Sequence, residues 1–287
     1  MPEHVDAAAS AADPPAATVP AIVARLRAAG CVFAEEEARL LLATATNPYE
    51  LAAMIDKRVA GSPLEYVVGW AEFCGLRIIV GPGVFVPRRR SEFLVDQAVA
   101  AVKSRAGTAA APIVLDLCCG SGAIGLAVTT VLSEACGTED TGRGGVELHA
   151  ADIDPGATAY ARRNLAAAGG QVYEGDLYDR LPAELRGRID VIVVNAPYVP
   201  SDEVGLMPAE ARLHEPLVAL DGGADGVGLH RRVAAEAPAW LASGGSLLIE
   251  TSERQAPLTE AAMTAAGLTT SVVSDDDLDT TVVIGRA

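Results

Sequence analysis

The sequence lacks the long apolar run that a membrane-spanning helix requires. Such a helix needs about 20 consecutive apolar residues, and no run in this chain of 287 residues approaches that length. The first residues, MPEHVDAAASAADPPAATVP, contain neither a basic start nor a hydrophobic block, so we expect no signal peptide. These absences predict a cytoplasmic protein that has no membrane partner.

The sequence also lacks the cysteine spacing of a disulfide framework or a zinc site. Its cysteines show no paired spacing and no Cys-x-x-Cys motif; they are Cys31, Cys74, Cys118, Cys119 and Cys136. Reduced thiols of a cytoplasmic protein fit this pattern better. We therefore expect no metal centre.

Basic charge is scarce as well. The chain has 22 Lys and Arg residues against 38 Asp and Glu residues, and its formal net charge is −16. A broad nucleic-acid footprint usually needs a basic face. We therefore expect no direct sequence-specific binding to nucleic acid, although a local basic strip is compatible with this composition.

The chain does have enough apolar residues, 50% of the total, for a sizeable core. Residues 1–18 are rich in Ala and Pro, which predicts a disordered tail. Residues 19–73 repeat apolar residues at three- and four-residue spacing, as in AIVARLRAAG and EEEARLLLATA, and predict a helical domain. Its third helix is expected to have Asn47 as its N-cap, Pro48 in its first turn and Gly61 just past its end.

The rest of the chain reads as an α/β domain. Residues 74–90, CGLRIIVGPGVFVPRRR, alternate β-formers with Gly and Pro and predict a β-hairpin connector. In residues 91–287, helices alternate with strands expected at 113–117, 146–152, 171–176, 189–195 and 246–250. A closing pair of strands flanks the acidic turn Asp275–Asp277, and residues 136–145 predict a surface loop. This rhythm predicts a mostly parallel, doubly wound sheet with at least one antiparallel strand at its C-terminal end.

A candidate cofactor site lies in VLDLCCGSGAIGLAV, where a strand runs into a Gly-containing turn and then a helix. Gly120 and Gly122 allow the backbone to approach a ligand at the carboxyl end of the strand, where open α/β sheets bind cofactors. NAD, nucleoside and sulfonium binders all use such a turn, and an ordinary tight turn has the same composition. No phosphate-binding Lys follows the glycines, and Cys118 occupies the first glycine position of a dinucleotide motif. Both departures favour S-adenosylmethionine, while Cys118 and Cys119 are expected to be small buried packing residues.

The ends of the next two strands carry carboxylates. Asp152 closes VELHAAD, where it can accept both ribose hydroxyls of an adenosine. The role of N-cap for the helix that follows suits Asp154 better than Asp152. Asp176 closes QVYEGD and is either a contact to the adenine edge or a solvated turn residue.

A candidate catalytic site lies in VVNAPYVP, where a buried strand ends on an amide. The nitrogen of a substrate amide is a poor nucleophile, because its lone pair is delocalised into the carbonyl. The side-chain oxygen of Asn195 can accept one of its N–H groups, and the backbone carbonyl of Ala196 the other, which aims the nitrogen at a methyl donor. Pro197 keeps the preceding residue extended, and Tyr198 offers a flat wall for a planar amide.

These motifs together resemble a known family. Asn195-Ala196-Pro197-Tyr198 resembles the Asn-Pro-Pro-Tyr signature of amino-group methyltransferases. The stretches GSPLEYVVGWAEFCGLRIIVGPGVFVPRRRSEFLVDQAV, ADIDPGATAYARRNL, EPLVALDGGADGVGLHRRV and PAWLASGGSLLIE are similar, in order, to the protein-(glutamine-N5) methyltransferases of the PrmC/HemK group. That family methylates the Gly-Gly-Gln loop of peptide chain release factors.

The resemblance implies a class I methyltransferase with a Rossmann-like domain, and it implies roles for individual residues. By the resemblance, the cofactor would be contacted by Cys118, Cys119, Gly120, Ser121, Gly122, Asp152 and Asn195. We also expect cofactor contacts from Asp176, Leu177, Phe85 and Arg88. The glutamine would be held by residues 195 to 198, with Phe85 and Arg88 forming a wall between cofactor and substrate. The helical domain would grip the protein substrate. Apart from the resemblance, we expect a monomer. Arg89 and Arg90 are expected to form a solvated basic turn.

Two departures from the family pattern leave alternatives. Ala196 replaces the first proline, and Cys118-Cys119 replaces a Gly followed by a small polar residue. A branch with an altered tetrapeptide is compatible with a glutamine in another protein. Adenine amino methylation in nucleic acid is a second alternative, which the acidic charge opposes. A third is a cofactor-binding regulatory protein that has lost catalysis.

Overall fold

The computed structural model describes residues 18–105, 111–135 and 145–287, which fall into two compact units. One unit ends at Val68 and the other begins at Gly69. The expected tail at 1–18, apart from Thr18, and the expected loop at 136–145, apart from Gly145, lie outside the described residues.

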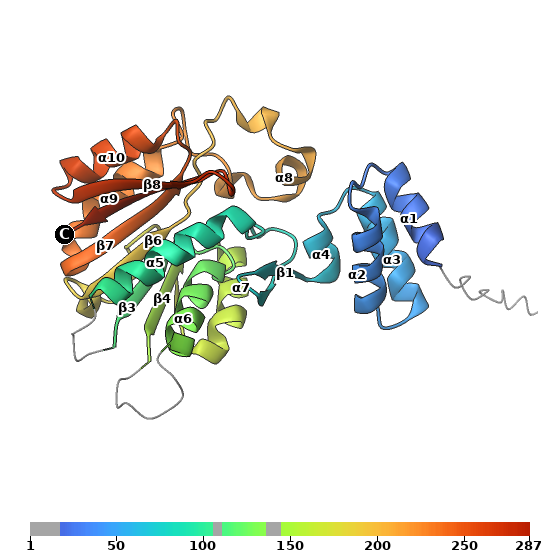
Figure 1. The fold of residues 1–287 in the computed structure, drawn as a ribbon, viewed down its shortest axis with the longest axis horizontal. Helices are drawn as coiled ribbons and strands as arrows, with labels where there is room; N and C mark the ends of the chain where they lie inside the picture. Colours follow the sequence, from blue (N-terminus) through green and yellow to red (C-terminus); the bar gives the residue numbers. More distant parts are fainter. Residues whose placement is uncertain (1–17, 106–110, 136–144) are drawn as a thin grey trace, which may run out of the picture. The chain divides into compact units, whose positions relative to one another are not determined.

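The first unit is helical (Figure 1), but it is shorter than the helical domain predicted at 19–73, because residues 70–73 form a strand of the second unit. It contains α1 (Val19–Ala28), α2 (Ala34–Thr44), α3 (Pro48–Val59) and α4 (Leu64–Val68). Their apolar faces meet in a core that includes Ile22, Leu26, Leu41 and Ile55. The side chain of Asn47 accepts the backbone N–H of Glu50 at 2.9 Å, and Gly61 has a φ of +96°. The predicted N-cap and the predicted terminating glycine of α3 are therefore confirmed.

The second unit opens with an antiparallel pair, β1 (Trp70–Phe73) and β2 (Leu76–Ile79). The hairpin predicted at 74–90 lies earlier in the chain. Its turn is formed by Cys74, with a φ of +48°, and Gly75, with a φ of +72°. No regular strand follows β2 before residue 89. Pro82 and Pro87 lack the N–H group that a strand ladder needs. The segment from 80 to 88 therefore runs as an irregular chain.

A central sheet forms the core of this unit (Figure 1). Its strands lie in the order β5 (Gln171–Glu174), β4 (Glu147–Asp152), β3 (Ile113–Leu117), β6 (Ile189–Val194), β7 (Leu241–Thr251), β9 (Thr280–Arg286) and β8 (Thr269–Asp275). The first five are parallel, and β9 is antiparallel to both β7 and β8. The predicted parallel sheet with a closing antiparallel pair is confirmed.

Helices cover both faces of the sheet (Figure 1). One layer contains α5 (Glu92–Ser104), α6 (Ala123–Ala135) and α7 (Pro155–Leu165), and the other contains α9 (Gly228–Glu236) and α10 (Ala256–Ala265). A separate segment after β6 carries the short α8 (Ala209–His214). The strand order reverses between β3 and its neighbours β4 and β6, and ligands of open α/β sheets bind at such a switch point.

Candidate active site

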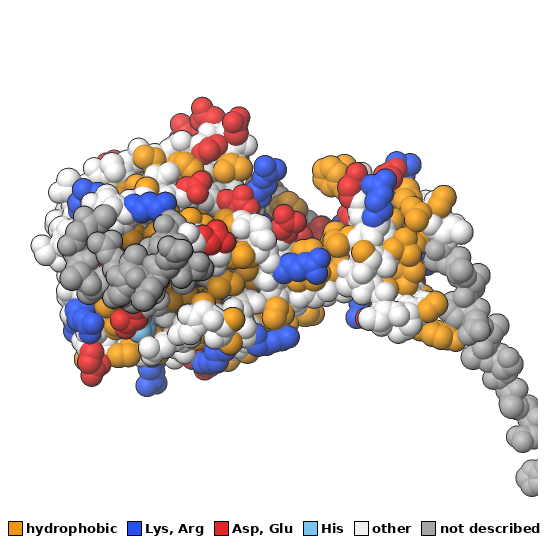
Figure 2. Space-filling view, turned by 60° about the horizontal axis from the view of Figure 1, so that its bottom comes forward, with side chains coloured by type: hydrophobic (Ala, Val, Ile, Leu, Met, Phe, Trp, Pro, Cys, Tyr) orange, Lys and Arg blue, Asp and Glu red, His pale blue; other side chains and the backbone are white. Residues whose placement is uncertain are grey.

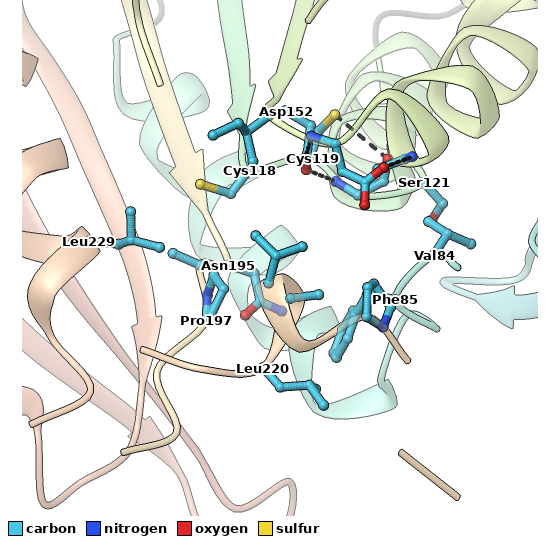
Figure 3. A pocket seen from close by; sticks show the side chains of 18 of the residues that line it. Val84, Phe85, Cys118, Cys119, Ser121, Asp152, Asn195, Pro197, Leu220 and Leu229 are labelled. Atoms are coloured by element: carbon cyan, nitrogen blue, oxygen red, sulfur yellow. Dashed lines mark hydrogen bonds between the residues drawn. The ribbon is translucent and has the colours of Figure 1, made fainter. Parts of the chain in front are cut away.

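One pocket lies at the carboxyl ends of β3, β4, β5 and β6 (Figure 3). Most of the residues singled out in the sequence line it: Phe85, Cys118, Cys119, Gly120, Ser121, Asp152, Asp176, Leu177, Asn195, Ala196, Pro197 and Tyr198. Two predicted contact residues, Gly122 and Arg88, are not among the lining residues. The pocket therefore joins the predicted cofactor end to the predicted catalytic end.

The turn after β3 has the backbone conformation that its glycines permit. Gly120 and Gly122 have φ values of +54° and +77°, and Cys118 adopts a φ of +60° although it is not a glycine. An added Cβ at Gly120 would meet nothing within 4 Å, whereas one at Gly122 would lie 3.1 Å from the Leu165 side chain. Gly120 thus leaves the backbone open to a ligand, and Gly122 allows the turn to pack on α7.

Asp152 organises this turn from the neighbouring strand. Its Oδ2 accepts the backbone N–H of Gly120 at 2.8 Å, and its Oδ1 accepts the N–H of Asp154 at 2.9 Å. Burial raises the pKa of Asp152, while these two hydrogen bonds act in the opposite direction. Each oxygen keeps a further lone pair for a ligand hydroxyl. Asp154 itself caps α7 by accepting from Gly156 and Ala157, as predicted.

Asp176 lines the pocket and is partly exposed. Its Oδ2 lies 2.8 Å from Nη2 of Arg232, another lining residue from α9. Leu177 follows with a φ of +50° and is buried against the central core. Both residues therefore close the pocket at the end of β5.

The two adjacent cysteines behave as packing residues. Cys119 is buried, and Cys118 packs against the central core. Burial, followed by the negative charge of nearby aspartates, raises the pKa of both thiols. Both are therefore neutral at physiological pH, which opposes a nucleophilic role.

Asn195 emerges from the end of β6 with its amide already oriented. Its Nδ2 donates a hydrogen bond to Oγ of Ser91 at 3.0 Å. This bond uses the donor end of the amide on the protein, so Oδ1 is the end available to a ligand. No described residue bonds the backbone N–H or carbonyl of the adjacent Ala196, which is buried.

A glycine-rich loop, residues 221–228, holds the tetrapeptide from behind. Gly222 donates its N–H to the Val199 carbonyl at 2.8 Å. A Cβ on Gly222 would lie 2.7 Å from the Pro197 carbonyl oxygen, and one on Gly226 would lie 2.2 Å from the Tyr198 carbonyl oxygen. The backbones pack so closely that only glycine fits. This contact explains why the loop sequence DGGADGVG accompanies the tetrapeptide.

Arg90 corrects one prediction. It was expected to lie in a solvated turn with Arg89, and Arg89 is exposed, but Arg90 lines the pocket. Its Nε lies 3.5 Å from Oε1 of Glu250, and its guanidinium lies 5.7 Å from the ring centroid of Tyr198. The buried carboxylate of Glu250 therefore draws this arginine inward.

Phe85 and Arg88 occupy different environments. Phe85 lines the pocket, whereas Arg88 forms an ion pair with the buried Glu215 and lies over the Phe85 ring at 4.9 Å from its centroid. Arg88 thus supports Phe85 from outside the pocket wall.

Three buried polar residues near the pocket were missed in the sequence. Asp116, in β3, accepts the N–H of Gly125 at 2.8 Å, and burial raises its pKa to about 8. Ser91 precedes α5, and Glu250 lies near the end of β7. Glu250 could have been found from the sequence, because it follows a run of apolar strand residues, as Asp152 and Asn195 do. No neighbouring residue in the sequence points to Ser91.

Basic patches, metal-binding groups and membrane-spanning helices were considered among the described residues. In the face shown in Figure 2, Lys and Arg side chains of the described residues are dispersed among Asp and Glu. Within the same residues, no group of His, Cys, Asp and Glu is arranged to hold a metal ion. None of the helices described is both long and apolar enough to cross a membrane.

Comparisons with known proteins agree with this geometry. The family model for the methyltransferase small domain matches residues 75–223. A release factor glutamine methyltransferase from Geobacter sulfurreducens is 38% identical over 71% of this chain and 66% of its own length. One from Mycolicibacterium smegmatis is 34% identical over 85% and 82%, respectively. A 4-amino-L-phenylalanine/4-methylamino-L-phenylalanine methyltransferase from Streptomyces pristinaespiralis is 35% identical over 74% and 69%. The chain therefore belongs to the methyltransferase small-domain family and, within it, to the family of the release factor glutamine methyltransferases.

Proposed function

We propose that this protein transfers a methyl group from S-adenosylmethionine to the side-chain amide nitrogen of a protein glutamine, that of the Gly-Gly-Gln loop in a peptide chain release factor. The names of two relatives described above support the reaction and the substrate. The proposal makes it a cytoplasmic enzyme that acts as a monomer.

The orientation of the Asn195 amide is the observation that carries this proposal. Because Nδ2 donates to Ser91, Oδ1 is the end left to accept an N–H of a substrate amide. The carbonyl of Ala196 provides the second acceptor at the same end of β6. An amide nitrogen has two N–H groups, and this pair of acceptors matches them.

The residues at the other end of the pocket fit the proposed cofactor. Asp152 presents a carboxylate already fixed by two backbone N–H groups, which suits a ribose diol. The remaining proposed contacts are Cys118, Cys119, Gly120, Ser121, Asp176 and Leu177, which line the same end. When bound, S-adenosylmethionine supplies an electrophilic methyl group on a sulfonium centre.

The protein's part in the reaction is to hold and polarise the amide. Two hydrogen bonds to acceptors concentrate electron density on the nitrogen and fix its direction. The nitrogen would gain a bond to the methyl carbon as the carbon–sulfur bond of the cofactor breaks, and its surplus N–H proton would pass to water. Tyr198 and Pro197 wall the planar group, and Phe85 covers it from the segment after β2.

We also propose that the helical unit recognises the protein substrate. Val32 and Phe33 precede α2 and are 82% and 67% exposed, which is unusual for adjacent large apolar residues. Replacing both by Ser should raise the KM for the protein substrate about tenfold with little change in kcat. Val272→Ser, at an exposed apolar position on β8, is the matched control. Equal effects of the two variants would contradict this role.

An aromatic amine is a second candidate acceptor. The relative named for 4-amino-L-phenylalanine shares much of this chain, and Ala196 departs from the usual tetrapeptide. An aniline-type nitrogen offers the same pair of N–H groups to Asn195 and Ala196. It would require no protein substrate.

Mass spectrometry of a release factor tests the proposal. The purified factor is incubated with this protein and S-adenosylmethionine, its intact mass is measured, and its peptides are mapped. A gain of one methyl on the Gly-Gly-Gln glutamine is the expected result. No gain, together with methylation of 4-amino-L-phenylalanine, would overturn it in favour of the second candidate.

A further inference from the structure

A glutamine at the start of α10 turns its side chain away from its own helix. Gln255 occupies the N-cap position of α10, yet its side chain caps none of the N–H groups of that helix. The residue is nonetheless buried, at 3% exposed. Burying an amide is costly unless its polar atoms find partners. The partners of Gln255 therefore indicate its role.

These partners are the backbones of two segments behind the pocket. The Nε2 of Gln255 donates to the Tyr198 carbonyl at 2.7 Å and to the Asp225 carbonyl at 3.0 Å. Tyr198 ends the tetrapeptide, and Asp225 lies in the glycine-rich loop at 221–228. One side chain thus uses both of its N–H groups to tie the two segments together.

The orientation of this amide is fixed by its surroundings. A backbone carbonyl can only accept, so two carbonyls at one end of the Gln255 side chain select its NH₂ group. At the other end, the Ser252 hydroxyl donates to Oε1 at 2.6 Å. A flipped amide would set its oxygen against both carbonyl oxygens. Both polar atoms of the side chain therefore have partners, in one arrangement of donors and acceptors.

The peptide unit held by Gln255 is close in the chain to a proposed substrate acceptor. The Ala196 carbonyl, proposed as the second acceptor for the substrate amide, precedes the Tyr198 carbonyl by two residues. The ring of Pro197 fixes one of the backbone torsions between them. A Tyr198 carbonyl that is held from behind therefore restricts both the direction of the Ala196 carbonyl and the placement of the Tyr198 ring.

The loop, the glutamine and the tetrapeptide are in close contact at this point. A Cβ on Gly226 would lie 2.0 Å from Nε2 of Gln255 and 2.2 Å from the Tyr198 carbonyl oxygen. Closely packed groups transmit a displacement to their neighbours. A shift of Gln255 would therefore displace the tetrapeptide as well.

We propose that Gln255 is a positioning residue, whose two N–H bonds hold the tetrapeptide against the glycine-rich loop and thereby fix the Ala196 carbonyl for the substrate amide. Ser252 acts through it, because its hydroxyl holds the amide oxygen. The inference rests on the proposed function and extends it from the residues that face the substrate to the residue that holds their backbone in place.

Gln255→Met tests this role, because methionine keeps the length of the side chain and removes its three hydrogen bonds. We expect kcat to fall about 10- to 100-fold, since small misplacements of reacting groups have effects of this size. The Kd for S-adenosylmethionine, measured by calorimetry, should stay within about twofold of the wild-type value. An unchanged kcat would overturn the inference.

Asn164→Leu is the matched control at the cofactor end. The buried Asn164 amide likewise donates to two backbone carbonyls, those of Ile79 at 3.0 Å and Ser121 at 2.8 Å. Because Ser121 lines the cofactor end, this variant should raise the Kd for S-adenosylmethionine. At saturating cofactor it should lower kcat less than Gln255→Met does. Comparable losses of kcat in the two variants would indicate general damage to the fold and would overturn the inference.

Ser252 provides a milder test, which does not depend on the folding of the methionine variant. Ser252→Ala should lower kcat about fivefold, the equivalent of one hydrogen bond between neutral groups. Ser252→Thr keeps the hydroxyl and should retain most of the wild-type kcat. If Ser252 acts through Gln255, the double variant Ser252→Ala/Gln255→Met should be no slower than Gln255→Met. Multiplicative losses would contradict this order of action and the proposal with it.

Two backbone signals keep the test independent of the proposed function. The N–H groups of Val199 and Gly226 belong to the same peptide units as the Tyr198 and Asp225 carbonyls, so their ¹⁵N signals report on the two bonds. Both signals should move in Gln255→Met and stay in place in Asn164→Leu. Unmoved signals in Gln255→Met would overturn the inference. A wild type that transfers no methyl group to glutamine would refute the proposed function alone, and these signals would still decide whether Gln255 holds the tetrapeptide.

Discussion

The two ends of the pocket are built from different kinds of contact. At the cofactor end, Asp152 is held by backbone N–H groups, one of them from Gly120 only 32 positions away. At the catalytic end, side chains hold side chains: Asn195 bonds Ser91 across 104 positions, and Tyr198 bonds Glu250 across 52. Both ends depend on the assembled sheet, because Asp152 reaches Gly120 from the neighbouring strand; they differ in that backbone groups hold the first end and side chains hold the second. Changes at the first should therefore alter cofactor affinity, and changes at the second should alter turnover.

Removing the Asn195 amide should have the largest effect. Asn195→Ala deletes one of the two proposed acceptors for the substrate N–H and should reduce kcat about 10²- to 10³-fold, the usual effect of removing a group that stabilises the transition state. The Kd for S-adenosylmethionine, measured by calorimetry, should change far less. Turnover at the wild-type rate would show that the Asn195 amide does not hold the substrate, which would contradict the proposed role of this end of the pocket.

The glycine loop offers a paired test of how tightly the catalytic end is held. Gly226 and Gly223 have φ values of +73° and +88°, so an alanine is strained at both. Only at Gly226 does the added Cβ approach the Tyr198 carbonyl oxygen, at 2.2 Å, while at Gly223 it meets nothing within 4 Å. Gly226→Ala should lower the free energy of unfolding about 1–3 kcal/mol more than Gly223→Ala does.

Urea unfolding and kcat should be measured for both glycine variants. Gly226→Ala should also be the slower enzyme, because the clash displaces Tyr198. Equal kcat values in the two variants would mean that the loop does not position the tetrapeptide.

Asp152→Ala should have the complementary effect at the cofactor end. It removes the proposed ribose acceptor and leaves two backbone N–H groups without their partner. The Kd for S-adenosylmethionine should rise about 10- to 100-fold, the cost of losing hydrogen bonds to a charged group. At saturating cofactor, kcat should fall much less. Asp179→Ala, at an exposed position, is the control, and a similar Kd in both variants would count against the assignment.

Ala196→Pro should have the smallest effect on turnover. No described residue accepts the N–H group that proline lacks, and the carbonyl proposed to bind the substrate is kept. The position is buried, so the added atoms should lower the free energy of unfolding by about 1 kcal/mol. Thermal unfolding and kcat measure the two effects. Complete loss of turnover would show that the backbone at Ala196 needs a conformation that a proline does not allow.

The same contrast explains which parts could be predicted from the sequence. The parallel sheet, its antiparallel closing pair and the caps of α3 and α7 follow from local patterns, and the structure confirms them. The hairpin lies earlier in the chain than predicted, because its first strand, WAEF, precedes the Gly- and Pro-rich stretch on which the prediction was based.

The support of the catalytic end could not be predicted in the same way. Arg90 and Ser91 lie where the sequence indicates a solvated turn, and the packing of α5 beside β6 and β7 brings Arg90 to Glu250 and Ser91 to Asn195. A buried charge selects its partners in three dimensions, so neighbouring residues in the chain give no sign of them. Glu250 did carry a signal, since it follows an apolar strand as Asp152 and Asn195 do.

A crystal structure with S-adenosylhomocysteine and a Gly-Gly-Gln peptide would test the division of the pocket most directly. The account predicts the ribose hydroxyls at the Asp152 carboxylate, and the glutamine nitrogen within hydrogen-bond distance of Asn195 Oδ1 and the Ala196 carbonyl. It also predicts that Asn195 Nδ2 still faces Ser91. A glutamine bound elsewhere, or an Asn195 amide turned with Nδ2 toward the peptide, would contradict it.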